Sequence, residues 1–456
     1  MNVDDRITLE SLQPAVNRVF AMAADKCRRL DLSWNKPNAT PVFTAAGKYT
    51  TRGWTEWTQG FQFGCMILTG DALDNRELID LGRQRTVERM LPHVTHIGVH
   101  DHGFNNLSTY GNLLRLMNEG RIDEEPWQRK TYEDAIAASG AVQASRWSET
   151  SCGLGYIYSF NGPHSLFIDT MRTTRILGVA HQLGHMLMGE NDLRINLLAR
   201  SIQHGLATSK YIVFHGDTEH NYDVRGRTAH EGTFNRNDGN FRARSTQQGY
   251  SPFSTWTRGL AWAMLGYAEE LEFLQTLTAA KFKNAVGMLK QEVVAEYLRC
   301  AIDTCDHYID DVTSSDGITY WDDGAPDLHQ LGDWHSQPAD PFNEFEPVDA
   351  SASAIAAQGL LRLGNYLGPR KGKRYTQAGL DVAGTLFNEP YLSVKKSHQG
   401  LLLHSIYHWP NRWDHVPKGS KVAHGESSMW GDYHLLELAH LIQRLGSDRP
   451  YPSFYL

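Results

Sequence analysis

The stretch 284–311, NAVGMLKQEVVAEYLRCAIDTCDHYIDD, carries the pattern that decides the fold class. Its apolar residues Val286, Leu289, Val293 and Tyr297 recur at intervals of three and four positions. That spacing places them on one face of an α-helix. The stretch is therefore predicted to be an amphipathic helix that packs against a core.

The same periodicity continues along most of the chain and predicts about twelve helices. They fall near 11–31, 54–69, 75–92, 104–119, 127–146, 167–185, 191–208, 254–274, 284–311, 349–367, 373–387 and 428–445. The alternation typical of strands is rare, and its two short candidates are 211–214 and 401–406. Loops rich in Gly, Asp and aromatic residues occupy 215–253, 312–348 and 404–427.

This order of elements predicts an all-α chain. A superhelical solenoid would need a repeat of fixed period, and the sequence has none. We therefore favour a closed toroid of helical hairpins, whose long loops form one rim of a central cleft. No Pro- or Ser-rich linker divides the sequence, so residues 1–456 are predicted to form a single domain.

Composition excludes several functional classes. The 44 Lys and Arg stand against 52 Asp and Glu, for a net charge of −8, and no basic run suggests nucleic-acid binding. The 5 cysteines form no CxxC pair, which argues against a disulfide framework or a thiolate zinc site. No apolar run is long enough to span a membrane. The N-terminal sequence shows no signal peptide, so we expect a cytoplasmic location unless a signal has been removed.

The aromatic content is high, at 11% with 12 Trp. Flat aromatic side chains are frequent in clefts that bind sugar rings. Trp57, in the sequence WTQGF, is one such residue near a predicted helix start, although aromatic residues in that position are usually core.

Two predicted helices begin with an aspartate in an unusual setting. The first is His100-Asp101-His102-Gly103-Phe104, and the second is Phe167-Ile168-Asp169-Thr170-Met171. Helix capping alone would explain both carboxyl groups. If Asp169 instead lies in a poorly solvated pocket with a second carboxylate nearby, its pKa is expected to rise so that it holds a proton near neutral pH.

A third polar and aromatic segment runs from Gln248 to Trp262, with the sequence QGYSPFSTWTRGLAW. In a helix, Arg258 and Trp262 lie one turn apart on the same face. An Arg beside an indole is a good receptor for a sugar carboxylate. The alternative is a buried structural Arg that packs against a core Trp.

Other site motifs are absent. The chain contains no HExxH, GxSxG or GxxxxGK[ST] sequence. His181 and His185 have metal-compatible spacing but lack a clear third ligand, and Cys300 and Cys305 are interpreted as helix-face residues. We therefore predict neither a metal site nor a cofactor.

Taken together, the motifs resemble the unsaturated glucuronyl hydrolases, glycoside hydrolase family 88. The resemblance rests on order and spacing from about Trp54 to about Leu441. The matching segments are HDHGF (100–104), IDTM (168–171), TAH (228–230), QGYS (248–251), STWTRGLAW (254–262), DASASAIAAQGLL (349–361) and SSMWGDYHLLE (427–437).

The resemblance implies an (α/α)6 barrel that removes a 4,5-unsaturated uronic acid from the non-reducing end of oligosaccharides produced by polysaccharide lyases. By position, Asp169 would donate a proton to C4 and then act as base towards water. Asp101 would bind sugar hydroxyls and help to keep Asp169 protonated. The substrate-binding positions would be His230, Gln248, Arg258 and Trp262, together with Trp57 and His100, and Arg258 is our choice for the uronate carboxylate.

Arg172 and Arg175 depart from the family pattern, which usually continues after this aspartate with uncharged residues. Our sharper hypothesis is that Arg172 binds a sulfate or a second carboxylate on the next sugar. The simpler hypothesis is a charge on a helix face. Trp334, His335, Trp409 and Trp413 are expected to shape the far side of the cleft.

Three other functions stay open from sequence. They are an unsaturated rhamnogalacturonyl hydrolase with the same toroid, a polysaccharide lyase, and a carbohydrate-binding toroid without activity. The choice of polysaccharide among glycosaminoglycan, ulvan, xanthan and gellan also stays open.

Overall fold

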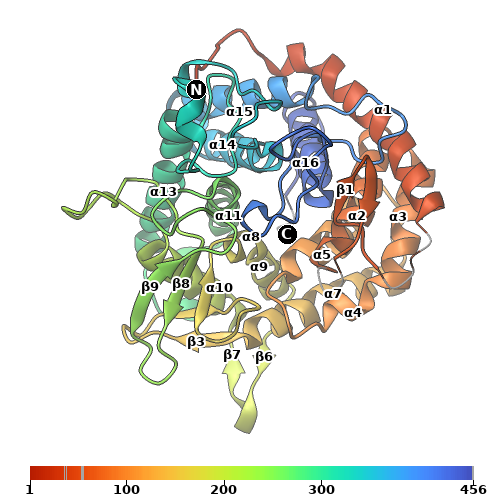
Figure 1. Ribbon diagram of the computed structural model, residues 1–456. Coiled ribbons are helices and arrows are strands. Elements are labelled where there is room, and N and C mark those ends of the chain that lie inside the picture. The colour runs from red at the N-terminus through yellow and green to blue at the C-terminus, as the bar shows by residue number, and fades with distance from the viewer. Residues whose placement is uncertain (35, 37–38, 53–55, 454–456) are drawn as a thin grey trace.

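The protein forms a closed ring of helices, as the computed structural model of residues 1–34, 36, 39–52 and 56–453 shows (Figure 1). The outer helices each bury one face. They are α1 (Leu9–Ser33), α3 (Arg76–Arg89), α7 (Pro126–Ser145), α10 (Leu197–Tyr211), α13 (Lys290–His307) and α15 (Lys373–Leu386).

The inner helices alternate with the outer ones along the chain and are buried over most of their surface. They are α2 (Gln59–Ala72), α5 (His102–Asn106) with α6 (Asn112–Asn118), α8 (Thr170–Thr173) with α9 (Arg175–Gln182), α11 (Thr257–Gln275), α14 (Ala350–Lys371) and α16 (Met429–Leu445). Contacts between α16 and α2 close the ring. The predicted (α/α)6 barrel is confirmed.

Each predicted helix corresponds to helical structure, but several predictions need correction. The helix predicted at 284–311 is two helices, α12 (Ala279–Val286) and α13, because Gly287 adopts a left-handed φ of 80° that ends α12. A π-helical turn, Leu107–Gly111, separates α5 from α6. The helix predicted at 167–185 starts only at Thr170 and is divided at Thr174. The predicted start at Trp54 lies outside the described residues, and a short 3-10 turn, Glu56–Thr58, precedes α2.

Short antiparallel strands lie between the helices of the ring, and one of them, β7 (Arg194–Ile195), occupies part of the helix predicted at 191–208, which starts only at Leu197. They are β1 (Phe43–Ala45) with β2 (Lys48–Thr50), β3 (Trp147–Glu149) with β4 (Gly155–Ile157), β6 (Leu187–Met188) with β7 (Arg194–Ile195), and β5 (Ser165–Phe167) with β8 (Glu231–Phe234) and β9 (Phe241–Ser245). The strands predicted at 211–214 and 401–406 are wrong, because these segments contribute only the isolated bridges Val213–Thr228 and Leu392–Leu402. The β5–β8 register pairs Phe167 with Glu231 and so brings Asp169 near His230.

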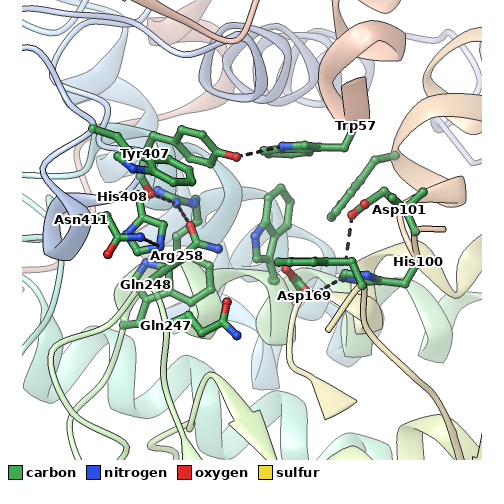
Figure 2. A pocket seen from close by; sticks show the side chains of 16 residues that line it. Trp57, His100, Asp101, Asp169, Gln247, Gln248, Arg258, Tyr407, His408 and Asn411 are labelled. Carbon is green, nitrogen blue, oxygen red and sulfur yellow. Dashed lines mark hydrogen bonds and ion pairs between the residues drawn. The ribbon is translucent and has the colours of Figure 1, made fainter. Parts of the chain in front are cut away.

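One end of the inner ring gathers the beginnings of its helices. Trp57 directly precedes α2, Asp101 precedes α5, Asp169 precedes α8, and Arg258 lies in the first turn of α11. All four line the same cleft (Figure 2). None of the helices in the described ranges is long and apolar enough to cross a membrane.

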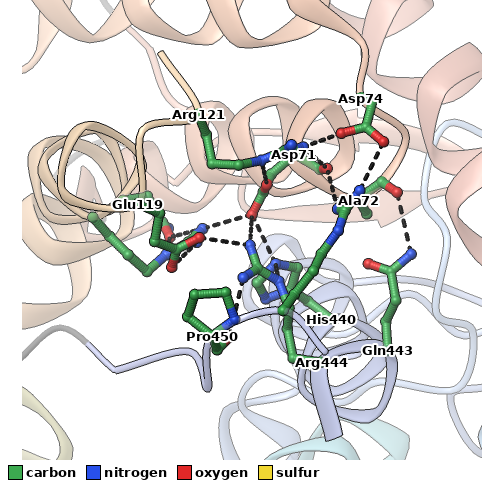
Figure 3. Close-up of polar contacts among 12 residues, drawn as sticks. Asp71, Ala72, Asp74, Glu119, Arg121, His440, Gln443, Arg444 and Pro450 are labelled. Atoms are coloured by element: carbon green, nitrogen blue, oxygen red, sulfur yellow. Dashed lines mark hydrogen bonds and ion pairs between the residues drawn. The ribbon is translucent and has the colours of Figure 1, made fainter. Parts of the chain in front are cut away.

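A buried ion network ties three inner helices together near their C-terminal ends (Figure 3). The fully buried carboxylate of Asp71 in α2 contacts Arg115 of α6 at 3.1 Å and Arg444 and His440 of α16 at 2.8 Å each. Burial opposes the ionisation of Asp71, but the hydrogen bond from His440 and the charge of Arg115 outweigh it and hold the pKa well below its ordinary value. The network therefore fastens the last helix of the ring to the earlier ones.

Asp71→Asn is expected to lower the free energy of unfolding by about 3–5 kcal/mol, because it leaves Glu119 as the one remaining carboxylate partner of the buried Arg115 and Arg444 among the described residues. Asp74→Asn is the matched control, since the Asp74 side chain is 56% exposed and its pairs are worth about 0–1 kcal/mol. Denaturant unfolding at neutral pH measures both variants. Because the Asp71 pKa is depressed in the folded state, the advantage of the parent should be full above about pH 4 and shrink below it. Equal small losses in both variants would contradict this role.

Candidate active site

The cleft at the N-terminal ends of the inner helices spans about 910 Å³, part of which is open to solvent. It is lined mainly by aromatic and polar side chains from both halves of the chain (Figure 2). The lining residues are Trp57, Val99, His100, Asp101, Phe104, Phe160, Asp169, Gln247, Gln248, Trp256, Arg258, Trp262, Tyr407, His408, Asn411 and Trp413.

His100 and Asp101 are placed by an unusually close helix contact. A Cβ atom on Gly103 would lie 2.2 Å from the carbonyl oxygen of Thr173 in α8, so only glycine permits this approach. The Thr173 hydroxyl also donates a hydrogen bond to the carbonyl oxygen of His100 at 2.9 Å. The glycine of the HDHGF segment thus brings the start of α5 against α8, where Asp169 lies.

Both aspartates occupy helix N-cap positions, yet neither side chain makes a capping hydrogen bond. The capping interpretation, which the sequence left open, therefore does not account for either carboxyl group. The Asp169 side chain is 14% exposed and the Asp101 side chain 12% exposed, and both line the cleft. Both carboxyl groups are therefore available to a ligand.

His100 lies between the two carboxyl groups. Its Nε2 is 3.1 Å from Oδ1 of Asp169 and 3.8 Å from Oδ1 of Asp101, and the ring is only 2% exposed. Burial disfavours a charged imidazole here, but the two carboxylates outweigh it and raise the pKa of His100 above its ordinary 6.5. The three side chains form one proton-sharing group.

The expected protonation of Asp169 needs correction. Burial alone would raise the pKa of Asp169, but the charge and hydrogen bond of His100 outweigh it and lower that pKa. The pKa that rises is that of Asp101, chiefly through burial. The motifs place two aspartates at helix starts but do not show that a histidine lies between their carboxyl groups. The two shifts favour the ion pair, in which His100 carries the proton and Asp169 is a carboxylate.

Aromatic rings form the wall beside these groups. Trp57 stacks on Trp430 with ring centroids 5.1 Å apart, and Phe104 contacts Trp262 at 4.8 Å. Trp262 is only 2% exposed, so it supports the floor more than it offers free surface. Trp57 and Trp262 thus lie where the sequence predicted them, in the wall of the cleft.

Arg258 lines the cleft but has its own acceptors within the protein. One terminal nitrogen, Nη1, contacts Asp349 at 2.7 Å and the carbonyl oxygen of Ile406. The other, Nη2, donates to Gln248 at 2.8 Å and to the carbonyl oxygen of Tyr407 at 2.7 Å. Because Arg258 is 2% exposed and paired with Asp349, it matches the alternative of a buried structural Arg, and it holds Gln248 and the 406–407 backbone in place.

His230 lies behind the cavity and is not among its lining residues. Its Nδ1 accepts hydrogen bonds from the backbone N–H groups of Gln247 at 2.9 Å and Gln248 at 3.3 Å. Burial lowers the pKa of His230 to about 3, so the ring is neutral. In this position His230 orients the two glutamines that do line the cavity.

The hypothesis that Arg172 binds a substrate anion is wrong. Its side chain is fully buried and pairs with Glu269 of α11 at 3.0 Å and Glu437 of α16 at 2.9 Å. Arg175 joins the same carboxylates, at 3.2 Å from Glu269. Neither arginine lines the cleft, because the neighbouring inner helices supply their counter-charges.

Several lining residues were not singled out from sequence. Tyr407, His408 and Asn411 come from the loop predicted to shape the far side of the cleft, and Trp413 of that loop is confirmed as a lining residue. The backbone N–H groups of Tyr407 and His408 donate to the buried carboxyl group of Asp414. Trp334, His335 and Trp409 do not line this cavity. The alternation of aromatic and polar residues in 404–414 was the one available signal.

A carboxyl pair at the base of an aromatic cleft in an α/α toroid is an arrangement suited to an enzyme that performs acid–base chemistry on a sugar. Proteins of similar sequence narrow this class further. It is 25% identical over 402 residues to an unsaturated glucuronyl hydrolase of Formosa agariphila, with 86% of this chain and 80% of that protein covered. It is 26% identical over 425 residues to an unsaturated chondroitin disaccharide hydrolase of Streptococcus pyogenes serotype M1, with 90% and 86% covered.

Among solved structures, the unsaturated glucuronyl hydrolase of Bacillus sp. GL1 matches with a TM-score of 0.70 at 20% identity, over 97% of this chain and 98% of that chain. No protein-family model matches the sequence. The chain is therefore similar over most of its length to unsaturated glucuronyl hydrolases, the family that its sequence motifs resemble.

Gly103→Ala is expected to push α5 away from α8 and to separate His100 from Asp169. The His100 pKa should then fall, because burial lowers it once the carboxylate partner is lost. NMR titration of the His100 ring, assigned with a His100→Gln spectrum, measures this shift. Gly178→Ala is the control, because its Cβ would meet only the Phe273 side chain, at 3.2 Å. An unchanged His100 pKa in Gly103→Ala would contradict the role of this contact.

Proposed function

We propose that the protein removes a 4,5-unsaturated uronic acid from the non-reducing end of oligosaccharides by hydrating the C4=C5 double bond. The observation that carries this proposal is the His100–Asp169 pair, with Asp101 beside it, at the base of an aromatic cleft. The names of the relatives, unsaturated glucuronyl hydrolase and unsaturated chondroitin disaccharide hydrolase, support the same substrate class.

The substrate is an enol ether, so the reaction begins with a proton. The π electrons of C4=C5 form a C–H bond at C4, and positive charge develops at C5 and the ring oxygen. Water adds at C5 and yields a hemiketal. Its opening breaks the bond between C5 and the ring oxygen, and the hemiacetal left at C1 then expels the sugar to which the uronate was linked.

The His100–Asp169 pair can deliver that proton and take one back. His100 is too buried to reach a sugar, whereas the Asp169 carboxyl group faces the cleft. The proton therefore passes from Nε2 of His100 to Asp169 across their 3.1 Å hydrogen bond, and from Asp169 to C4. Asp169, once deprotonated, acts as the base for the attacking water. In this scheme His100 holds the proton before the reaction, whereas the sequence motifs led us to expect it on Asp169.

The other lining residues hold the sugar. As a carboxylate, Asp101 would accept hydrogen bonds from sugar hydroxyls and stabilise the positive charge that develops at C5. The rings of Trp57 and Trp413 offer flat faces to the sugar rings, and Gln248, Tyr407 and Asn411 offer polar groups. None of these roles requires a cofactor.

Recognition of an anionic sugar is compatible with the net charge of −8. The long inner helices all begin at the cleft end of the ring; they are α2, α11, α14 and α16. Residues at their starts contact one another there: Arg258 pairs with Asp349, and Trp57 stacks on Trp430. Helix N-termini carry partial positive charge, which favours a bound carboxylate. Arg258, whose charge is paired with Asp349, holds Gln248 in position at the cleft. The single-domain organisation and the cytoplasmic location stay predictions.

Asp169→Asn is expected to lower the turnover of an unsaturated uronyl disaccharide at least ~100-fold, because the amide cannot transfer the proton. The assay follows the loss of the near-ultraviolet absorbance of the conjugated double bond. Asp74→Asn, the same substitution at an exposed position, should keep the parent rate. Near-parent turnover by Asp169→Asn would refute the assignment.

A panel of lyase-digested polysaccharides and of their undigested parents separates the alternatives. A fall in absorbance supports the hydrolase, and the digest that falls fastest identifies the preferred class, including rhamnogalacturonan fragments. A rise in absorbance on an undigested polymer would identify a lyase. No change on any member of the panel would identify a binding protein.

A further inference from the structure

A group of potential metal ligands lies on the outer wall of the ring, apart from the cleft. Within the described ranges, His215, Glu296 and Cys300 place their ligand atoms within 4.8 Å of one another. Glu296 and Cys300 are four residues apart on one face of α13, and His215 follows the end of α10. None of the three lines the cleft.

The histidine is oriented as a metal ligand would be. Its Nδ1 hydrogen-bonds to Oδ2 of Asp303 at 2.9 Å, and Oδ1 of Asp303 is held in turn by Arg225 at 2.7 Å. A carboxylate on Nδ1 fixes the ring tautomer and leaves the Nε2 lone pair for a cation. That Nε2 points to the Ser209 hydroxyl at 3.3 Å, and this hydroxyl donates to Glu296. The Ser209 hydroxyl thus lies between two of the three candidate ligands.

We propose that His215, Glu296 and Cys300 form a zinc site in which the cation replaces the Ser209 hydroxyl as the bridge between them. An imidazole nitrogen, a carboxylate oxygen and a thiolate sulfur are the ligand types that Zn²⁺ prefers, and three protein ligands leave one position for water. The cation enters from solvent, because His215 and Glu296 are partly exposed whereas Cys300 is fully buried. On binding, the Cys300 thiol loses its proton to solvent.

The site would clamp a loop to the outer wall. Residues 214–227 form a loop closed by backbone hydrogen bonds of Phe214 with Arg227 and Gly226. This loop leads into β8, which is preceded by His230, the residue that orients Gln247 and Gln248. Zinc would tie the start of this loop to α13 and so stabilise it without contacting the substrate.

Titration of the chelator-treated full-length protein with Co²⁺ and Zn²⁺ tests the site. The parent should bind one equivalent of Co²⁺ with a thiolate-to-cobalt charge-transfer band, and Zn²⁺ should displace it and raise the Tm. Cys300→Ser should lose the band. Glu296→Gln and His215→Gln should weaken binding at least ~10-fold, the loss seen even when a residue that only orients a ligand is removed.

Two controls separate a metal site from a hydrogen-bond network. Ser209→Ala removes the bridging hydroxyl but keeps all three ligands, so it should retain cation binding. Cys305→Ser changes another fully buried thiol of α13 outside the cluster and should leave the band unchanged. The proposal is overturned if the parent shows no charge-transfer band, or if Glu296→Gln and His215→Gln bind Co²⁺ as tightly as the parent. Because these two positions are partly exposed, the test stands even if Cys300→Ser fails to fold.

Discussion

The close contact of Gly103 in α5 with the Thr173 backbone in α8 is the constraint on which the cleft depends. These helices are separated by the whole of α7 in the sequence, and each begins with an aspartate. Only at this short distance can His100 contact Asp169 while Asp101 stays beside it. The geometry of the proposed general acid is therefore set by main-chain packing, in which a glycine takes part because any side chain would prevent it.

The buried, fully paired charges and the carboxyl groups of the cleft lie at different positions along the axis of the ring. Towards the C-terminal ends of α2, α6 and α16, charged groups are buried and paired, as Asp71 is with Arg115, His440 and Arg444. A second buried layer joins Arg172 and Arg175 to Glu269 and Glu437. At the opposite end the carboxyl groups of Asp101 and Asp169 share only a histidine. Such a partly compensated group can exchange a proton with a substrate, whereas the fully paired clusters cannot.

Local sequence pattern predicted the helices, the toroid, the two aspartates and much of the cleft wall, because helix periodicity and helix starts are local properties. What it missed depends on distant residues. The spacing of Arg172 after Asp169 suggested, as one of two hypotheses, that it binds the substrate. Glu269 and Glu437, which are distant in the sequence, instead hold it in the core. Arg258 was predicted at the cleft, yet its partners Asp349 and Tyr407 were not apparent. The histidine between the carboxyl groups reversed the expected pKa shift of Asp169. No local pattern reports such pairings.

Proton delivery to C4 requires the C4=C5 double bond of the substrate, and a saturated uronic acid lacks that bond. The most direct measurement compares two disaccharides that differ only in the C4=C5 bond, one unsaturated and one saturated, with release of the reducing-end sugar followed for both. Hydration through Asp169 predicts turnover of the unsaturated disaccharide and no detectable release from the saturated one. Comparable release from both would contradict it and would indicate ordinary attack at C1.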